Sequence, residues 1–166
     1  MSFELSVGMR FAIISRHFKR HLDEACSSHE LTGVQLMVLS RLHRLEDAGL
    51  PHVRQRDLEL ETHLAHPTMT ELIKKLERKG FVSCAVCPSD RRSKMIASTE
   101  KARALRGQLD AIDRQVFQDL CQGISPEEQR LLLSLLDRML QNIMEETGKD
   151  LCDHNDQKAV CPSAGI

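Results

Sequence analysis

The spacing of apolar residues changes abruptly at Gly80, and this change restricts the fold more than any other feature of the chain. Before Gly80 the apolar residues recur at helical spacing, as Met69, Leu72, Ile73 and Leu76. Pro67 suits the start of this helix, because the N–H that proline lacks would have no partner in a first turn. After Gly80 the run FVSCAV is β-branched and short, CPSDRRS has turn chemistry, and KMIAS is a second short apolar run. The sequence therefore predicts a helix from Pro67 that leads directly into a two-stranded hairpin.

Three helices are predicted before this unit. The first spans about residues 6 to 27, with an apolar stripe of Val7, Phe11, Ile14, Phe18 and Leu22. The second begins at Thr32, which forms a capping-box pattern with Gln35, and ends near Gly49 and Pro51. A short helix covers Arg54 to Glu61.

Two helices and a tail are predicted after the hairpin. Thr99 can cap a helix with the stripe Ala102, Leu105, Leu109, Ile112, Val116 and Leu120, and Gly123 ends it. Ser125, Pro126 and Glu128 mark the start of the last helix, because they combine an N-cap, a first-turn proline and a capping-box glutamate. Its stripe is too wide for one neighbour: Leu131, Leu132, Leu135, Leu136, Met139, Leu140 and Ile143. From Gly148 onward no period is visible, which predicts a loose tail.

Length and composition fit one helix-rich domain. The chain has 166 residues, of which 41% are hydrophobic and 28% charged. No stretch approaches the roughly 18 apolar residues of a membrane span, and the N-terminus lacks an export signal, so we expect a cytoplasmic protein without a membrane partner. The six cysteines are then expected to be thiols. Tyr and Trp are absent, which argues against a platform that stacks single-stranded bases.

Positive charge gathers in the helix and hairpin, although the formal net charge of the whole chain is only -1. Between His66 and Lys94 there are seven basic residues and three acidic ones, an excess of four positive charges. The order short helix, turn, helix and hairpin between Arg54 and Ser98 is that of a winged helix-turn-helix, in which the second helix enters the major groove of DNA. The predicted fold is therefore mostly α with a small β-hairpin wing.

The side chains on this unit suit contact with DNA. The inward apolar set leaves Thr68, Thr70, Glu71, Lys74 and Lys75 on the outer face of the helix. Threonine hydroxyls near the helix start can meet base edges or phosphates, and the lysines can meet phosphate or guanine. Arg91 and Arg92 lie at the hairpin tip, where an arginine can enter the minor groove. The DNA-binding candidates are His66, Pro67, Thr68, Thr70, Lys74, Lys75, Arg91, Arg92 and Lys94.

From LTGVQLMVLSRL through DLELETHLAHPTMTELIKKLERKGFV to PSDRRSKMIASTEKARAL the chain resembles the MarR family of transcription regulators. The likeness covers roughly residues 7 to 145 and is sharpest at Leu76–Val82 and Asp90–Ser93. It implies one domain over residues 1–147, with a DNA lobe at about 31–98 and a dimerisation lobe from 1–30 and 99–147, followed by the tail 148–166. It also implies a homodimer on double-stranded operator DNA and a repressor released by a small molecule bound between the lobes. Glu71 departs from the basic or small residue of many relatives, and Cys84 and Cys87 are unusual in the wing.

An alternative hypothesis is a thiol- or metal-responsive regulator of the same fold. Its sensing candidates are Cys26, Cys84, Cys87, His17 and His21. Cys84 and Cys87 have the C-x-x-C spacing of half a zinc site, but no second pair stands nearby, and small residues packing in a hairpin explain them more simply. His17 and His21 share a helix face without an evident third ligand. The sequence predicts no metal site and no cofactor. It has no nucleophile motif or phosphate-binding glycine loop, so an enzyme is not expected.

Overall fold

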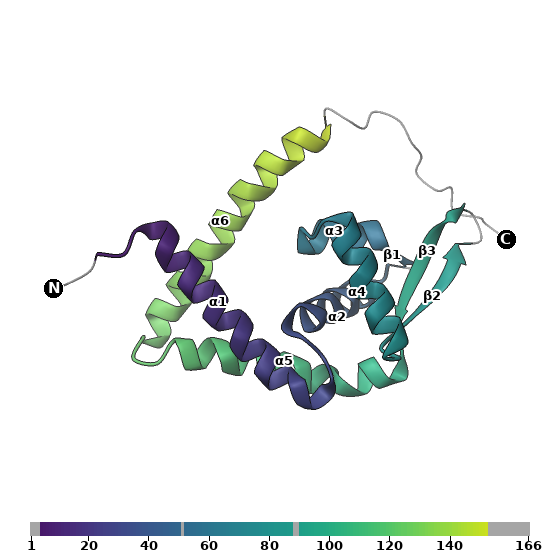
Figure 1. Cartoon of the computed structure of the whole chain (residues 1–166). Coiled ribbons are helices and arrows are strands. Elements are labelled where there is room, and N and C mark those ends of the chain that lie inside the picture. The colour runs from purple at the N-terminus through teal and green to yellow at the C-terminus, as the bar shows by residue number, and fades with distance from the viewer. Residues whose placement is uncertain (1–3, 51, 88–89, 153–166) are drawn as a thin grey trace. The chain divides into compact units, whose positions relative to one another are not determined.

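The computed structural model describes residues 4–50, 52–87 and 90–152 (Figure 1). Helices dominate, as predicted: α1 Val7–Cys26, α2 Gly33–Asp47, α3 Gln55–Thr62, α4 His66–Arg78, α5 Glu100–Leu120 and α6 Pro126–Cys152, with a 3-10 turn at Ser27–His29. The strands are β1 Val53–Arg54, β2 Val82–Cys87 and β3 Asp90–Ser98. The chain divides into two units, one running through Leu120 and one beginning at Cys121. No helix in the described ranges has the length and apolarity that crossing a membrane would require.

Several helix boundaries follow from local hydrogen bonds. Thr32 accepts a bond from the backbone N–H of Gln35, and the Gln35 side chain accepts one from the backbone of Thr32, which completes the predicted capping box. Ser125 and Glu128 make the same reciprocal bonds at the start of α6. Gly80 follows α4 with φ +74°, a left-handed conformation that favours glycine and stops the helix. These boundaries confirm the predicted helix ends.

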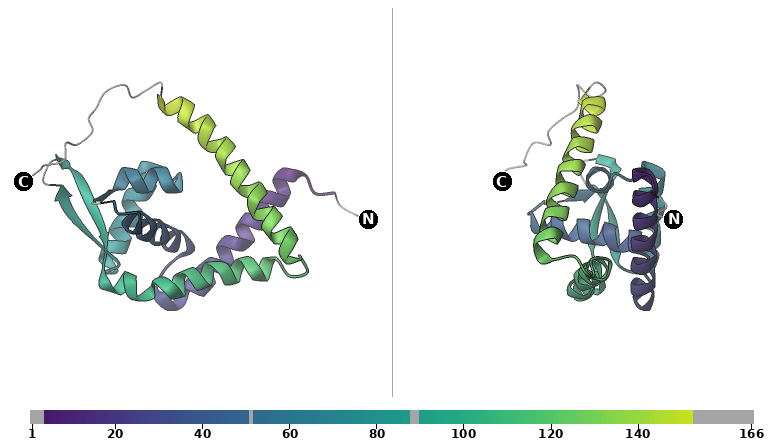
Figure 2. Two further views of the ribbon diagram at one scale, coloured as in Figure 1. Left: turned by 180° about the vertical axis from the view of Figure 1, so that it is seen from behind. Right: turned by 90° about the vertical axis from the view of Figure 1, so that its left-hand side faces the viewer.

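Glycine is required where α1 meets α2. A Cβ atom at Gly33 would lie 2.8 Å from the Leu22 Cβ, which is too close for two carbon atoms. The backbone N–H of Gly33 also donates to the Asp23 carboxylate at 2.6 Å. The end of α1 is therefore held directly against the start of α2. The same helix α1 packs along α5 (Figure 2).

The core of the first unit lies between α2, the helix pair α3 and α4, and the base of the sheet. Its fully buried side chains include Leu39, Leu42, Leu58, Met69, Leu76 and Phe81. Three of them, Leu58, Met69 and Leu76, hold α3 and α4 to the rest of the core. Burial of apolar surface on this scale stabilises the fold and fixes the angle at which α4 is presented.

Replacing Leu39 with alanine should lower the free energy of unfolding by about 2–5 kcal/mol, because the side chain has no exposed surface and its loss leaves a cavity. Leu60→Ala is the matched control, since Leu60 is 52% exposed and its loss should cost less than about 0.5 kcal/mol. Chemical denaturation at one fixed protein concentration measures both. Equal losses in the two variants would contradict this account of the core.

The sheet has three strands rather than the predicted two. Its order is β1-β3-β2, and both pairs are antiparallel. The missed strand β1 has only two residues, with Val53 opposite Ile96, so it has no alternation that a sequence pattern could reveal. The prediction also began the returning strand at Lys94, whereas β3 begins at Asp90. Strand pairing uses the backbone, and polar residues can therefore continue it.

The last helix is longer than predicted. It passes Gly148, where the tail was expected to begin, and reaches Cys152. A single interior glycine weakens a helix by about 1 kcal/mol and does not have to end it. The rest of the predicted tail, residues 153–166, lies outside the described residues.

Candidate nucleic-acid interface

The helix pair α3 and α4 forms the predicted helix-turn-helix. The two helices are joined by a short turn in which His63 has φ +53°. On α4, Met69, Ile73 and Leu76 are buried, which confirms the predicted inward face. Thr68, Glu71, Lys74 and Lys75 are exposed on the other side, and so are His66 and Pro67 in the first turn. The structure therefore brings most of the predicted DNA-contacting residues of α4 to one solvent-exposed surface.

Thr70 differs from its predicted outward position, because it is only partly exposed. Its hydroxyl donates to the His66 carbonyl at 2.9 Å and accepts a bond at 2.8 Å from the Gln55 side chain on α3. The hydroxyl proton of Thr70 is therefore engaged in a hydrogen bond within the protein. Thr70 holds α4 to α3, and Thr68 is the threonine whose hydroxyl no described bond engages.

A polar cluster of Gln55, Glu59, His66 and Thr70 links the two helices at the start of α4. The Gln55 amide nitrogen lies 2.7 Å from Glu59 Oε1 and 2.8 Å from Thr70 Oγ1. The same carboxylate oxygen lies 2.7 Å from His66 Nδ1. This cluster was not predicted from the sequence, since Gln55 and Glu59 show no pattern of their own and meet His66 only across the turn.

Charge on the outer face of α4 is partly paired. Lys74 Nζ donates to Glu71 Oε1 at 2.9 Å, and this bond together with the lysine charge holds the pKa of Glu71 below its ordinary value. Glu71 therefore stays ionised beside the lysine at neutral pH. Lys75 is exposed and forms no ion pair among those described, so its charge is less compensated than that of Lys74.

The hairpin β2–β3 is the predicted wing. Lys94 is exposed on β3, and Arg91 and Arg92 occupy early positions of the same strand; their side chains lie outside the described residues. Residues 88–89, at the turn itself, are also outside them. The structure thus places all three cations on one strand of the wing.

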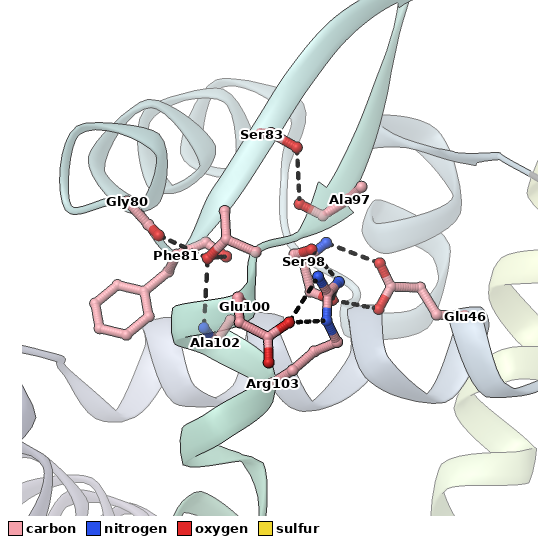
Figure 3. Close-up of polar contacts among 10 residues, drawn as sticks. Glu46, Gly80, Phe81, Ser83, Ala97, Ser98, Glu100, Ala102 and Arg103 are labelled. Atoms are coloured by element: carbon pink, nitrogen blue, oxygen red, sulfur yellow. Dashed lines mark hydrogen bonds and ion pairs between the residues drawn. The ribbon is translucent and has the colours of Figure 1, made fainter.

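Polar bonds fix the base of the wing to α2, to α5 and to the turn that follows α4 (Figure 3). Glu46 on α2 accepts bonds from the Ser98 backbone N–H at 2.8 Å and from its hydroxyl at 2.6 Å. Arg103 on α5 donates to the Ser98 carbonyl at 2.5 Å. The Thr99 hydroxyl donates to the Gly80 carbonyl at 2.7 Å. Because these bonds join the wing base to α2, α5 and the end of α4, the wing and α4 are presented in one fixed relation.

Two of the three candidate sensing thiols, Cys26 and Cys84, lie in surroundings that disfavour the thiolate. Cys26 has no exposed surface, and burial, helped by Asp23 and Asp113, raises its pKa to about 11. Burial and Glu77 raise the pKa of the partly exposed Cys84 to about 11 as well. A thiol in this state carries little thiolate at neutral pH, the form that reacts with oxidants and binds metals. The side chain of Cys87 lies outside the described residues.

The two candidate histidines stack on each other. The rings of His17 and His21 lie 5.4 Å apart at 23°, and Arg20 contacts the His17 ring. Among the described residues, no group of three or more His, Cys, Asp or Glu is placed to hold a metal ion. The geometry gives these histidines a packing contact on α1.

A cavity of about 550 Å³ lies between α1, α2 and α5. Phe18, Leu22 and Met37 contribute apolar walls. The charged side chains around it are Lys19, Arg41, Arg44, Arg114, Asp110 and Asp113. The family resemblance implied a pocket between the lobes, but none of these residues was predicted to line it. Two arginines three positions apart on α2, Arg41 and Arg44, were the available signal.

These features define a winged helix-turn-helix of the DNA-binding type. The sequence model of the MarR family matches residues 29–93, which include the helix pair and most of the wing. The fold extends beyond the matched segment. The crystal structure of MarR superposes with a TM-score of 0.78 at 19% identity, covering 90% of this chain and 98% of that one.

Two further structures are informative. MepR of S. aureus, solved as a complex with DNA, is 26% identical with a TM-score of 0.73, and the match covers 84% of this chain and 99% of that chain. BpsR of Bordetella bronchiseptica, whose DNA binding is regulated by 6-hydroxynicotinic acid, is 22% identical with a TM-score of 0.71, over 84% and 96% of the two chains. The two matches therefore span nearly the full length of MepR and of BpsR.

Proposed function

We propose that this protein is a cytoplasmic, homodimeric repressor that binds a pseudo-palindromic operator and releases it when a small molecule binds. The exposed surface of α4, with Thr68, Lys74 and Lys75, carries the proposal. In this fold α4 is the helix that enters the major groove, and the wing reaches the adjacent backbone and minor groove. The likeness to MepR, which was solved with DNA bound, supports the same use of the surface here. Two such helices in a dimer would address half-sites about one helical turn apart.

Exposed apolar side chains support the homodimer. On α1, Val7 is 70% exposed and Ile14 is 58% exposed, although both belong to an amphipathic stripe. On α6, considered by itself, the exposed apolar residues are Leu131, Leu132, Leu133, Leu135, Met139, Leu140, Ile143 and Met144. Monomeric soluble proteins rarely expose so much apolar surface on single helices. A second copy of the chain is the partner that would cover both helices in a symmetric pair.

The cavity supports control by a small molecule. It combines apolar walls with four cationic and two acidic side chains, a composition suited to an amphipathic ligand with a negative group. Partial burial and the neighbouring Asp110 raise the pKa of Asp113 above its ordinary value. The likeness to BpsR supports a regulatory ligand in a protein of this fold. Repression, rather than activation, is proposed by analogy with the family.

Selection of duplexes from a random pool by the purified protein tests the function. We expect recovery of a pseudo-palindromic sequence that the protein then protects in a footprint, with two half-sites on one face of the DNA. The control is Thr68→Ala, which should reduce discrimination between selected and random duplexes more than it reduces binding to random duplexes. If no sequence is enriched and no duplex is retained at low salt, the proposed function is wrong.

A further inference from the structure

The pair Glu59–His66 lies at the start of α4, at one end of the proposed DNA-binding surface, and helix packing alone does not explain it. The side chain of Glu59 is only 20% exposed, whereas that of His66 is 75% exposed. The carboxylate oxygen and the imidazole Nδ1 are 2.7 Å apart. The partly buried Glu59 carboxylate therefore holds the Nδ1 edge of the His66 ring, and the rest of the ring faces solvent. His66 is the first residue of α4, the helix that we propose enters the major groove.

Hydrogen-bond counting determines which nitrogen of His66 carries the proton. The Gln55 amide has two N–H donors, and its two short contacts, at 2.7 and 2.8 Å, are to Glu59 Oε1 and Thr70 Oγ1. The same nitrogen also lies 3.1 Å from His66 Nδ1 and 3.3 Å from the His66 carbonyl oxygen, but its two N–H donors are directed to the two shorter contacts. A carboxylate only accepts, so Nδ1 must donate to Glu59. In the neutral ring Nε2 consequently carries a lone pair and no hydrogen.

A lone pair at Nε2 is the wrong chemistry for a phosphate or for the guanine edge, because both present acceptors. Only the imidazolium form of His66 donates at Nδ1 and Nε2 together. The positive charge of the imidazolium also compensates the negative charge of the Glu59 carboxylate, which would otherwise lie unpaired near the DNA backbone.

We infer, on the basis of the proposed function, that His66 contacts DNA as an imidazolium held by Glu59 and that each chain takes up one proton when it binds DNA. Glu59 acts as the positioning residue and does not itself touch DNA. Proton uptake means that affinity for DNA falls as the pH rises, by at most ~10-fold per pH unit for each proton taken up. In a dimer with two His66 side chains on DNA, two protons would be taken up, and the slope of log affinity against pH would double.

The experiment measures the dissociation constant of a duplex selected by this protein, from about pH 5.5 to 8, the range in which histidine charge changes. The variants are His66→Gln, which cannot titrate, and Glu59→Gln, which keeps an acceptor for Nδ1 but removes the negative charge. His63→Asn is the matched control, because His63 lies in the same turn without the carboxylate contact, and asparagine tolerates its φ of +53°. Thermal unfolding of each variant at both ends of the pH range monitors the fold.

We expect His66→Gln to lose a pH dependence that the wild type and His63→Asn share. Glu59→Gln should bind like the wild type near pH 5.5 and progressively more weakly above it, since an acidic partner favours the charged ring. Selection of a duplex followed by equal pH slopes in wild type and His66→Gln would overturn this inference and leave the proposed function standing. Failure to retain any duplex at any pH would overturn both.

Discussion

Replacing Leu140 with aspartate is expected to convert the dimer into a monomer and to abolish operator binding at concentrations where the wild type binds. Leu140 is 49% exposed on α6 and belongs to the apolar set that we propose is covered by the second chain. Burying a carboxylate among leucines without a partner is strongly unfavourable, and twofold symmetry applies the penalty twice. The dimer dissociation constant should rise on the order of 100-fold or more. Sedimentation equilibrium measures it, and DNA titration measures the linked loss of binding.

The control for this variant is Leu60→Asp. Leu60 is as exposed as Leu140, at 52%, but lies on α3, outside the proposed dimer surface. The Leu60→Asp variant introduces the same charge at a leucine of similar exposure, so its dimer dissociation constant should stay within about threefold of the wild-type value. A Leu140→Asp protein that sediments as a dimer would show that α6 is covered by something other than a second copy of the chain.

Replacing Arg91 and Arg92 together with alanine should weaken binding to operator and random duplexes by similar factors. Both residues lie at the start of β3, close to the turn of the wing, whose base is fixed by the bonds of Glu46 and Arg103 to Ser98. A rigid base keeps cations near the DNA backbone at little further cost in conformational entropy. The loss should be about 1–3 kcal/mol for each chain. The slope of log K against log salt should become shallower by roughly 0.9 for each phosphate contact removed.

The matched control removes the same charge from another part of the chain. Arg130 and Arg138 are both exposed on α6, and Arg130 pairs with Glu127 at 2.8 Å. Alanine at these two positions changes the net charge equally and should leave the salt slope unchanged when the protein is kept well above its dimer constant. If the wing variant retains the wild-type slope, the wing does not contact phosphate.

The features that could be predicted from the sequence are those with local causes. Helix starts at Thr32 and Ser125 were predictable because each cap bonds a residue three positions away. The inward face of α4 was predictable because helical spacing puts Met69, Ile73 and Leu76 on one side. The family resemblance added the order of the elements, and with it the wing.

The features that could not be predicted depend on contacts between distant segments. The strand β1 exists because Val53 pairs with Ile96, and two residues have no period. Thr70 looked like an outward donor until the position of Gln55, on the preceding helix, was known. The cation-rich cavity likewise requires α1, α2 and α5 to be assembled. Sequence spacing says which face of a helix is polar, but not which of those polar groups the fold itself has already bonded.

Helix α2 serves two separate regions of the first unit. Arg41 and Arg44 face the cavity, and Glu46, less than one turn further on, holds the base of the wing through Ser98. Under the proposed function, we therefore expect substitutions that tilt or shorten this helix to alter effector response and operator affinity together. Variants in which only the effector response is lost should instead map to the cavity walls supplied by α1 and α5. A genetic screen for non-inducible mutants would find there the residues that distinguish one effector from another.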